Sequence, residues 1–248
     1  MQLGMQFYSL RREAEADLRA ALASVPGLGY SAIELANPHG WGGWRWRDEL
    51  GQLGLAVVGA HVRMEDLEGD WAARVAFQRE LGNRRLVVPV PQAGWETAGR
   101  EEYRETARRL NALGARAADE GLELAYHNHH WEFADYGDGE PGCGMGTLLG
   151  ETDPELVGFE VDTAWTTKGG WDVVEFLHEH ASRVSMVHAK EYRAADDSEP
   201  PMGEGDVDFP SVVKLCAARR WPLVVEYESE PAPEGLAHSA RCLQQLLD

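Results

Sequence analysis

Residues 157–190, VGFEVDTAWTTKGGWDVVEFLHEHASRVSMVHAK, contain one complete strand–helix–strand unit. The short apolar run Val157–Val161 predicts a strand, the helix-patterned segment Trp171–His180 follows it, and Val184–Ala189 predicts the next strand. Strands that are short and almost continuously apolar are typical of a parallel sheet that is covered on both faces. This stretch therefore predicts parallel strands joined by crossover helices.

The same alternation continues along the whole chain. Its predicted strands are rich in Val, Ile, Leu, Phe and Tyr, and they are Leu3–Tyr8, Ala32–Ala36, Ala56–Val62, Arg85–Val90, Glu123–Asn128, Val157–Val161, Val184–Ala189 and Leu223–Tyr227. Its predicted helices are Asp17–Val25, Arg45–Leu53, Asp70–Leu81, Arg100–Glu120, Met145–Leu149, Trp171–His180, Phe209–Ala218 and Pro233–Leu247. Eight strands that each precede a helix form either a closed barrel or a long doubly wound sheet.

The turn after the first predicted strand helps to decide between these folds. A dinucleotide-binding sheet would carry a glycine-rich GxGxxG turn there, whereas this chain reads YSLRRE. The chain has 248 residues, and about 250 residues are typical of a (β/α)8 barrel. We therefore predict the α/β class, with a single (β/α)8 TIM barrel domain over residues 1–248.

The composition limits the expected partners and location. With 42 acidic and 23 basic residues the net charge is −19, and such a surface repels nucleic acid, which is bound through lysine and arginine. No stretch approaches the roughly 18 apolar residues that indicate a membrane span, and the N-terminus lacks the features of a secretory signal. The three cysteines have no disulfide pattern. We expect a cytoplasmic protein that binds a small molecule, with no nucleic-acid or membrane partner.

Polar side chains gather where the predicted strands end, which is where (β/α)8 barrels build their active sites. They are Glu34, His61, His127, Asn128, His129, Glu132, Asp162, His188, Lys190, Glu226 and Glu228. Converging carboxylates repel one another and resist ionisation, and a divalent cation removes that conflict. A mixture of carboxylate and imidazole donors suits manganese, magnesium, cobalt or zinc. The two longest irregular segments, 133–144 and 193–208, also follow strands and are expected at this rim.

Each of these residues also has a purely structural interpretation. Asp162 or Glu226 could cap a helix at the end of its strand, and His188 could be a hydrogen-bonded core histidine. Glu132 lies beyond its strand, in a loop. Lys190 could form a salt bridge with Glu226 or Asp162 instead of contacting a substrate.

Two further groups have more than one interpretation. His127 and His129 share one face of a strand, so they could form a separate metal site, or they could position the ligands and the substrate. The second role is the one we favour. The tryptophans of segment 41–46 could cover an apolar surface, line a sugar site, or form a contact between copies in a homo-oligomer.

At these positions the chain resembles the xylose isomerase-like barrel superfamily of sugar isomerases and epimerases. The similar segments occur in order from end to end: LGMQFYSLR, SAIELA, GAHV, YHNHHWEF, ETDPELVGFEVDTAW, RVSMVHAKE, MGEGDVDF and VVEYE. The resemblance implies one divalent metal ion, held by a glutamate, an aspartate, a histidine and a glutamate from the last four strands. Carried over, these are Glu132, Asp162, His188 and Glu226.

This chain departs from the family pattern at two positions. Ala125 occupies the place of the strand-five glutamate of better-known epimerases, so Glu132 is its substitute by resemblance. Trp165 stands where many epimerases have a histidine that touches the substrate. The related apurinic endonucleases bind three zinc ions through histidines that this chain lacks at Trp165 and in VVPV, which makes DNA repair the weakest alternative.

The resemblance implies an isomerase or epimerase of a sugar, keto-sugar or cyclitol. The metal would polarise a carbonyl, and Glu132 and Glu226 would exchange a proton through an enediolate. Expected substrate contacts are His61, His127, Trp165, Lys190 and Arg193. Two alternatives remain: a dehydratase of an inosose or similar keto-polyol, which begins with the same proton abstraction, and a non-catalytic sugar-binding barrel.

Overall fold

Eight short strands close into a barrel in the computed structural model, which describes residues 2–91 and 95–247. The strands are β1 (Leu3–Gln6), β2 (Ala32–Leu35), β3 (Ala56–His61), β4 (Arg85–Val88), β5 (Glu123–His127), β6 (Val157–Asp162), β7 (Val184–Ala189) and β8 (Leu223–Val225). Each strand pairs in parallel with the next one along the chain, and β8 pairs with β1, with Leu3 opposite Leu223. The predicted (β/α)8 barrel is confirmed.

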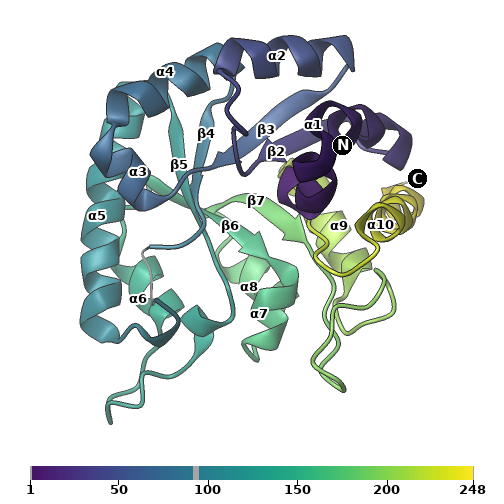
Figure 1. Ribbon diagram of the computed structural model, residues 1–248. Helices are drawn as coiled ribbons and strands as arrows, with labels where there is room; N and C mark the ends of the chain where they lie inside the picture. The colour runs from purple at the N-terminus through teal and green to yellow at the C-terminus, as the bar shows by residue number, and fades with distance from the viewer. Residues whose placement is uncertain (1, 92–94, 248) are drawn as a thin grey trace.

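Helices cover the outside of the barrel (Figure 1). They are α1 (Arg11–Ser24), α2 (Gly43–Gln52), α3 (Met64–Gly69), α4 (Trp71–Leu81), α5 (Arg100–Asp119), α6 (Gly144–Glu151), α7 (Thr163–Lys168), α8 (Val173–Glu179), α9 (Phe209–Arg219) and α10 (Ala232–Leu247). Four 3-10 helices add η1 (Phe7–Leu10), η2 (Val25–Leu28), η3 (Trp95–Thr97) and η4 (Trp131–Phe133). Within the described residues, no helix is both long and apolar enough to cross a membrane.

The beginning of the chain differs from the prediction for local reasons. The first strand ends at Gln6, before the predicted Tyr8, because the Gln6 side chain accepts a hydrogen bond from the Tyr8 backbone N–H (3.1 Å) and the chain turns into η1. Helix α1 begins at Arg11, earlier than the predicted Asp17. Asp17 has a non-helical backbone and accepts a hydrogen bond from the Ala20 N–H (3.0 Å), so it caps the second half of a kinked helix.

The barrel has two apolar regions. Its interior is filled by a small cluster of buried side chains, namely Val87, Ala125, Met186 and Val224, with Val58 against them. The larger region lies between the strands and the helices and contains fully buried Trp46, Tyr126 and Phe159. Because side chains alternate between the two faces of a strand, the residue two positions after an interior apolar residue also points into the barrel. On the last strands these positions hold His127, His188 and Glu226.

Two long loops, 133–144 and 193–208, extend from the same end of the barrel (Figure 1). The second is held in place by Glu191, whose buried carboxylate accepts hydrogen bonds from the N–H groups of Gly203 (2.8 Å) and Val207 (3.2 Å). Both loops follow strands, as expected for the active-site rim of such a barrel. The rim is therefore where the polar strand ends and the longest irregular segments meet.

Candidate metal centre

Four buried side chains from consecutive strands converge inside the rim of the barrel. His127 ends β5, Asp162 ends β6, His188 lies on β7 and Glu226 directly follows β8. Each offers a donor atom, and these atoms all lie within 4.8 Å of one another. Asp162 and His188 are fully buried, and His127 and Glu226 are nearly so. Two carboxylates and two imidazoles this close together form a donor set suited to a divalent cation.

The two oxygens of Asp162 have different roles. Oδ1 accepts a hydrogen bond from the Trp165 N–H (2.8 Å) and caps α7. Oδ2 is buried and has no hydrogen-bond partner among the described residues. The Asp162 backbone is itself fixed, because its N–H donates to Asn128 Oδ1 (3.1 Å). The helix-cap interpretation therefore applies to one oxygen, and the other is available as a ligand.

His188 also has one occupied and one available side. Its Nε2 lies 2.6 Å from Glu34 Oε2 and 3.1 Å from Glu160 Oε1, so the hydrogen on Nε2 has carboxylate acceptors. Its Nδ1 lies 3.9 Å from Asp162 Oδ2 and 3.6 Å from Glu226 Oε2, and it makes no hydrogen bond within the part of the chain that the structure describes. A carboxylate that orients the far nitrogen of a histidine is the usual support of a metal-binding imidazole.

The pKa values show how this group is balanced without a cation. Burial alone would lower the pKa of His188, but the nearby carboxylates, Glu160 first, raise it well above its usual value. Burial raises the pKa of Asp162 to about 7. Protons therefore compensate the converging carboxylates in the metal-free protein. A cation would replace those protons, so its affinity should increase with pH.

A second buried group supports the first one from deeper in the barrel. His61 Nε2 lies 2.8 Å from Glu160 Oε2 and 3.3 Å from Glu34 Oε2, and Gln6 Nε2 donates to Glu34 Oε2 (2.8 Å). His61, His127, Glu160 and His188 also bring four donors within 4.8 Å of one another. In this group, however, His61 and His188 already pair through Nε2 with the Glu160 carboxylate, at 2.8 and 3.1 Å. Among the described residues no hydrogen bond joins His127, Asp162, His188 and Glu226 to one another, so this group is the better metal site.

Sequence reasoning gave no role to Glu160 and named Glu34 only as a polar residue on its strand. Both stand next to irregularities in the barrel, because the strand register shifts between Ile33 and Glu34 and between Phe159 and Glu160. Such bulges redirect side chains near active sites. The sequence did contain one signal for Glu160: it lies two residues before Asp162, so both side chains point to the same face of their strand.

Lys190 forms a salt bridge with Glu226, which is one of the two roles that the sequence left open for it. Its Nζ lies 3.2 Å from Glu226 Oε2 and is also hydrogen-bonded to Glu228. Burial alone would lower the pKa of Lys190, but the carboxylates around it, Glu226 first, raise it. Nζ also lies 4.6 Å from the centre of a Trp165 ring. The ammonium group therefore remains charged beside the four donors.

The structure does not bring Glu132 together with the other three predicted ligands. Glu132 Oε1 accepts a hydrogen bond from the Tyr126 hydroxyl (2.7 Å), and Oε2 accepts one from the His129 backbone N–H (2.9 Å). Tyr126 faces away from the barrel interior, against Phe159. His127, which lies two residues after Ala125 on the same face of β5, joins the donor group instead.

Replacing Glu132 by Gln is expected to leave manganese affinity unchanged and to remove one source of pH dependence from the stability of the fold. The amide oxygen can accept from the His129 N–H while the NH2 group donates to the Tyr126 hydroxyl oxygen, so Gln resembles the protonated carboxyl. Burial raises the pKa of Glu132 to about 7. The native carboxyl thus holds a proton that the unfolded one releases, and wild-type stability falls as pH rises from 4.5 to 7, by at most about 1.4 kcal/mol per pH unit.

The stability of the Glu132→Gln variant relative to the wild type should therefore increase as pH rises through this window. Urea unfolding across the window measures this difference, and calorimetric titration with manganese measures the affinity. A large loss of manganese affinity in a folded variant would instead place Glu132 among the ligands.

The remaining predicted contacts lie at the rim. Trp165 is half-buried, and its ring lies 5.7 Å from that of His129 and 6.4 Å from that of Trp131, forming an aromatic wall beside Lys190. Arg193 pairs with Asp196 (2.8 Å) inside its own loop and not with the donor group.

The tryptophans of segment 41–46 do not form one surface. Trp46 is fully buried against Trp41 (5.1 Å between rings) and donates to the Pro38 carbonyl oxygen (2.9 Å), whereas Trp44 is 58% exposed. Trp46 therefore belongs to the core, and a contact between copies through the whole segment would require it to leave that position.

Comparison with known proteins identifies the family. The family model of the xylose isomerase-like TIM barrel matches residues 27–246. Inosose dehydratase from Lactiplantibacillus plantarum is 30% identical over 53% of this chain and 49% of its own length. Inosose dehydratase from Clostridium perfringens is 28% identical over 70% of this chain, and the match spans 64% of the relative.

A solved structure shows the same fold over the full length. The sugar phosphate isomerase/epimerase from Parabacteroides distasonis is 24% identical and superposes with a TM-score of 0.84 over 99% of this chain and 98% of that one. The chain belongs to the xylose isomerase-like TIM barrel family, as its resemblance implied.

Proposed function

We propose that this protein is a divalent-metal-dependent lyase that removes water from a cyclic polyhydroxylated ketone of the inosose type. The observation that carries this proposal is the group of four buried donors, His127, Asp162, His188 and Glu226, in which Asp162 Oδ2 and His188 Nδ1 have no hydrogen-bond partner among the described residues. Similarity to inosose dehydratases supports the substrate class.

The four donors would hold manganese, magnesium, cobalt or zinc. When bound, such an ion orients vicinal oxygens and polarises the carbonyl, which acidifies the neighbouring C–H. Glu34 and Glu160 keep His188 in place from the opposite side. The charge of Lys190 offsets part of the negative charge of Glu226 and Glu228.

Two rim residues have the protonation states that dehydration needs. Burial lowers the pKa of His129 well below its usual value, so this imidazole is neutral and can accept the C–H proton. Lys190 remains an ammonium group and can donate a proton to the departing hydroxyl, which leaves as water when the C–O bond breaks. His129 lies close to the donor group, with its ring 4.9 Å from that of His127.

Epimerisation begins with the same proton abstraction but needs an acid and a base on opposite faces of the substrate. The pair expected for this role was Glu132 and Glu226. Glu132 is hydrogen-bonded to Tyr126 and to the His129 backbone, outside the donor group. Its position therefore supports elimination of water over proton exchange between two glutamates.

Metal removal and the identity of the product test this proposal together. Chelator-treated protein should lose at least about a hundredfold in rate, and adding back manganese, magnesium, cobalt or zinc should restore it. Proton NMR of an inosose in D2O should show that ring C–H signals disappear as the substrate eliminates water. Deuterium exchange with the ring hydroxyls retained would show an epimerase instead. Binding of the inosose without any turnover would show a non-catalytic barrel.

A further inference from the structure

A cavity of about 360 Å³ lies where β2, β3 and β4 end, between these strand ends and helices α3 and α4. It is lined by the outward-facing Leu35 and Ala60, by Arg63 and Asp66 at the start of α3, and by Arg74 and Gln78 of α4. His61, which contacts Glu34 and Glu160 inside the barrel, also lines this cavity. The cavity therefore adjoins the buried network that supports the candidate metal centre, whereas its guanidinium and amide donors come from α4 and the start of α3.

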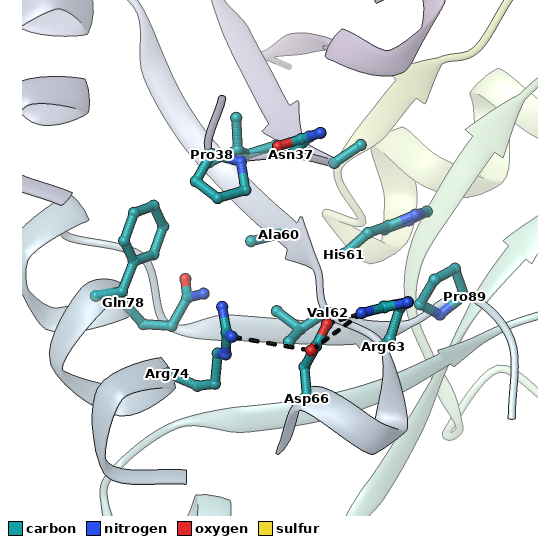
Figure 2. A pocket seen from close by; sticks show the side chains of 13 residues that line it. Asn37, Pro38, Ala60, His61, Val62, Arg63, Asp66, Arg74, Gln78 and Pro89 are labelled. Carbon is teal, nitrogen blue, oxygen red and sulfur yellow. Dashed lines mark hydrogen bonds and ion pairs between the residues drawn. The ribbon is translucent and has the colours of Figure 1, made fainter. Parts of the chain in front are cut away.

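The cavity carries more positive than negative charge, in a chain whose net charge is −19. Figure 2 shows Arg63 and Arg74 reaching toward Asp66 from two sides. Arg63 holds Asp66 through two hydrogen bonds, Nε to Oδ2 (2.9 Å) and Nη2 to Oδ1 (3.2 Å). Arg74 Nη2 is 3.8 Å from Asp66 Oδ1, beyond hydrogen-bond distance. Asp66 thus neutralises one guanidinium, and the second is in excess.

The donors of Arg74 and Gln78 are available on this wall. Arg74 Nε is buried and has no hydrogen-bond partner among the described residues. Gln78 is almost fully buried, and its Oε1 already accepts from Asn83 Nδ2 (2.8 Å). What Gln78 can still offer is therefore its amide N–H group. Guanidinium and amide donors without a matching acceptor are the groups that recognise carboxylate and phosphate oxygens.

We propose that this cavity is a second binding site, which takes the carboxylate or phosphate group of a small anionic molecule. Arg74 and Gln78 donate to its oxygens, and Arg63 does so after partly releasing Asp66. This site does not depend on the reaction of the metal centre.

Calorimetric titration of chelator-treated protein with inorganic phosphate, D-glucose 6-phosphate, D-glucuronate and D-glucose tests the proposal. We expect at least one of the three anions to bind and neutral glucose not to bind. Binding of the phosphates without glucuronate identifies a phosphate site, and the reverse identifies a carboxylate site. Arg74→Gln should weaken binding about tenfold or more, since a hydrogen bond to a charged group contributes about 1.5–3 kcal/mol.

Two other variants separate this effect from damage to the fold. Asp66→Asn should strengthen anion binding, because it removes the competing carboxylate, and a misfolded protein cannot mimic that gain. Arg104→Gln is the matched control, since Arg104 also lies in a helix and is 44% exposed, against 38% for Arg74. The proposal is overturned if no anion binds, or if Arg74→Gln weakens binding no more than Arg104→Gln does.

Discussion

Replacing Asp162 by Asn is expected to abolish metal binding and turnover together while leaving the fold intact. The amide can keep its oxygen where Oδ1 caps α7 by accepting from Trp165. Its NH2 group then takes the position of the unpartnered Oδ2, and an NH2 group cannot serve as a ligand. The loss of one anionic ligand should weaken manganese binding at least about a hundredfold. Turnover measured by NMR should fall in step.

The variant is informative because it keeps the hydrogen bond that caps α7. An effect on metal binding can therefore be distinguished from an effect on the stability of the helix. Thermal unfolding of the chelated proteins should show a small change, since the hydrogen bond to the Trp165 N–H is kept. Glu123→Gln is the matched control: Glu123 is an exposed carboxylate at the other end of the barrel, where β5 begins. If Asp162→Asn binds manganese as tightly as the wild type, the four donors are not the metal site.

The sequence predicted the fold and much of the donor group because both depend on position along strands. Alternation of apolar runs and helix-patterned segments specifies the barrel, and parallel strands bring their carboxyl ends to one rim. Asp162, His188 and Glu226 each occupy such an end, so their convergence follows from the fold. Boundaries were less predictable, since the ends of β1 and α1 depend on single side-chain hydrogen bonds of Gln6 and Asp17.

Other parts of the site depend on features that residue patterns do not contain. Glu132 was carried over from the family resemblance as the strand-five ligand, yet it lies in the 3-10 helix η4 and accepts a hydrogen bond from the Tyr126 hydroxyl, outside the donor group. The spacing of Glu160 from Asp162 indicated the face of its strand but not its contact with His188. Both Glu34 and Glu160 lie next to register shifts in β2 and β6, and no local preference in the sequence indicates where a shift occurs. The roles of these three glutamates required the three-dimensional arrangement.

Replacing Glu34 by Gln is expected to affect both the stability and the metal affinity of the protein. Glu34 is fully buried and faces His61 (3.3 Å) and His188 (2.6 Å). Removing one charge from such a network leaves the others without compensation, which costs about 3–5 kcal/mol. His188 also loses its strongest orienting contact, so manganese affinity should fall about 10–100-fold. Urea unfolding and calorimetry measure the two effects.

A second variant tests the position of this carboxylate without changing any charge. Gly59 lies on β3, beside Glu34 of the neighbouring strand β2. A Cβ atom at Gly59 would lie 2.6 Å from Glu34 Oε1 and 3.0 Å from the Met186 methyl group. Gly59→Ala should therefore displace the carboxylate from His188 and also weaken manganese binding. Gly51→Ala is the matched control, since Gly51 lies in α2 with nothing within 4 Å of an added Cβ. If Glu34→Gln and Gly59→Ala both bind manganese like the wild type, the carboxylate does not orient the ligand, and the buried network has only a structural role.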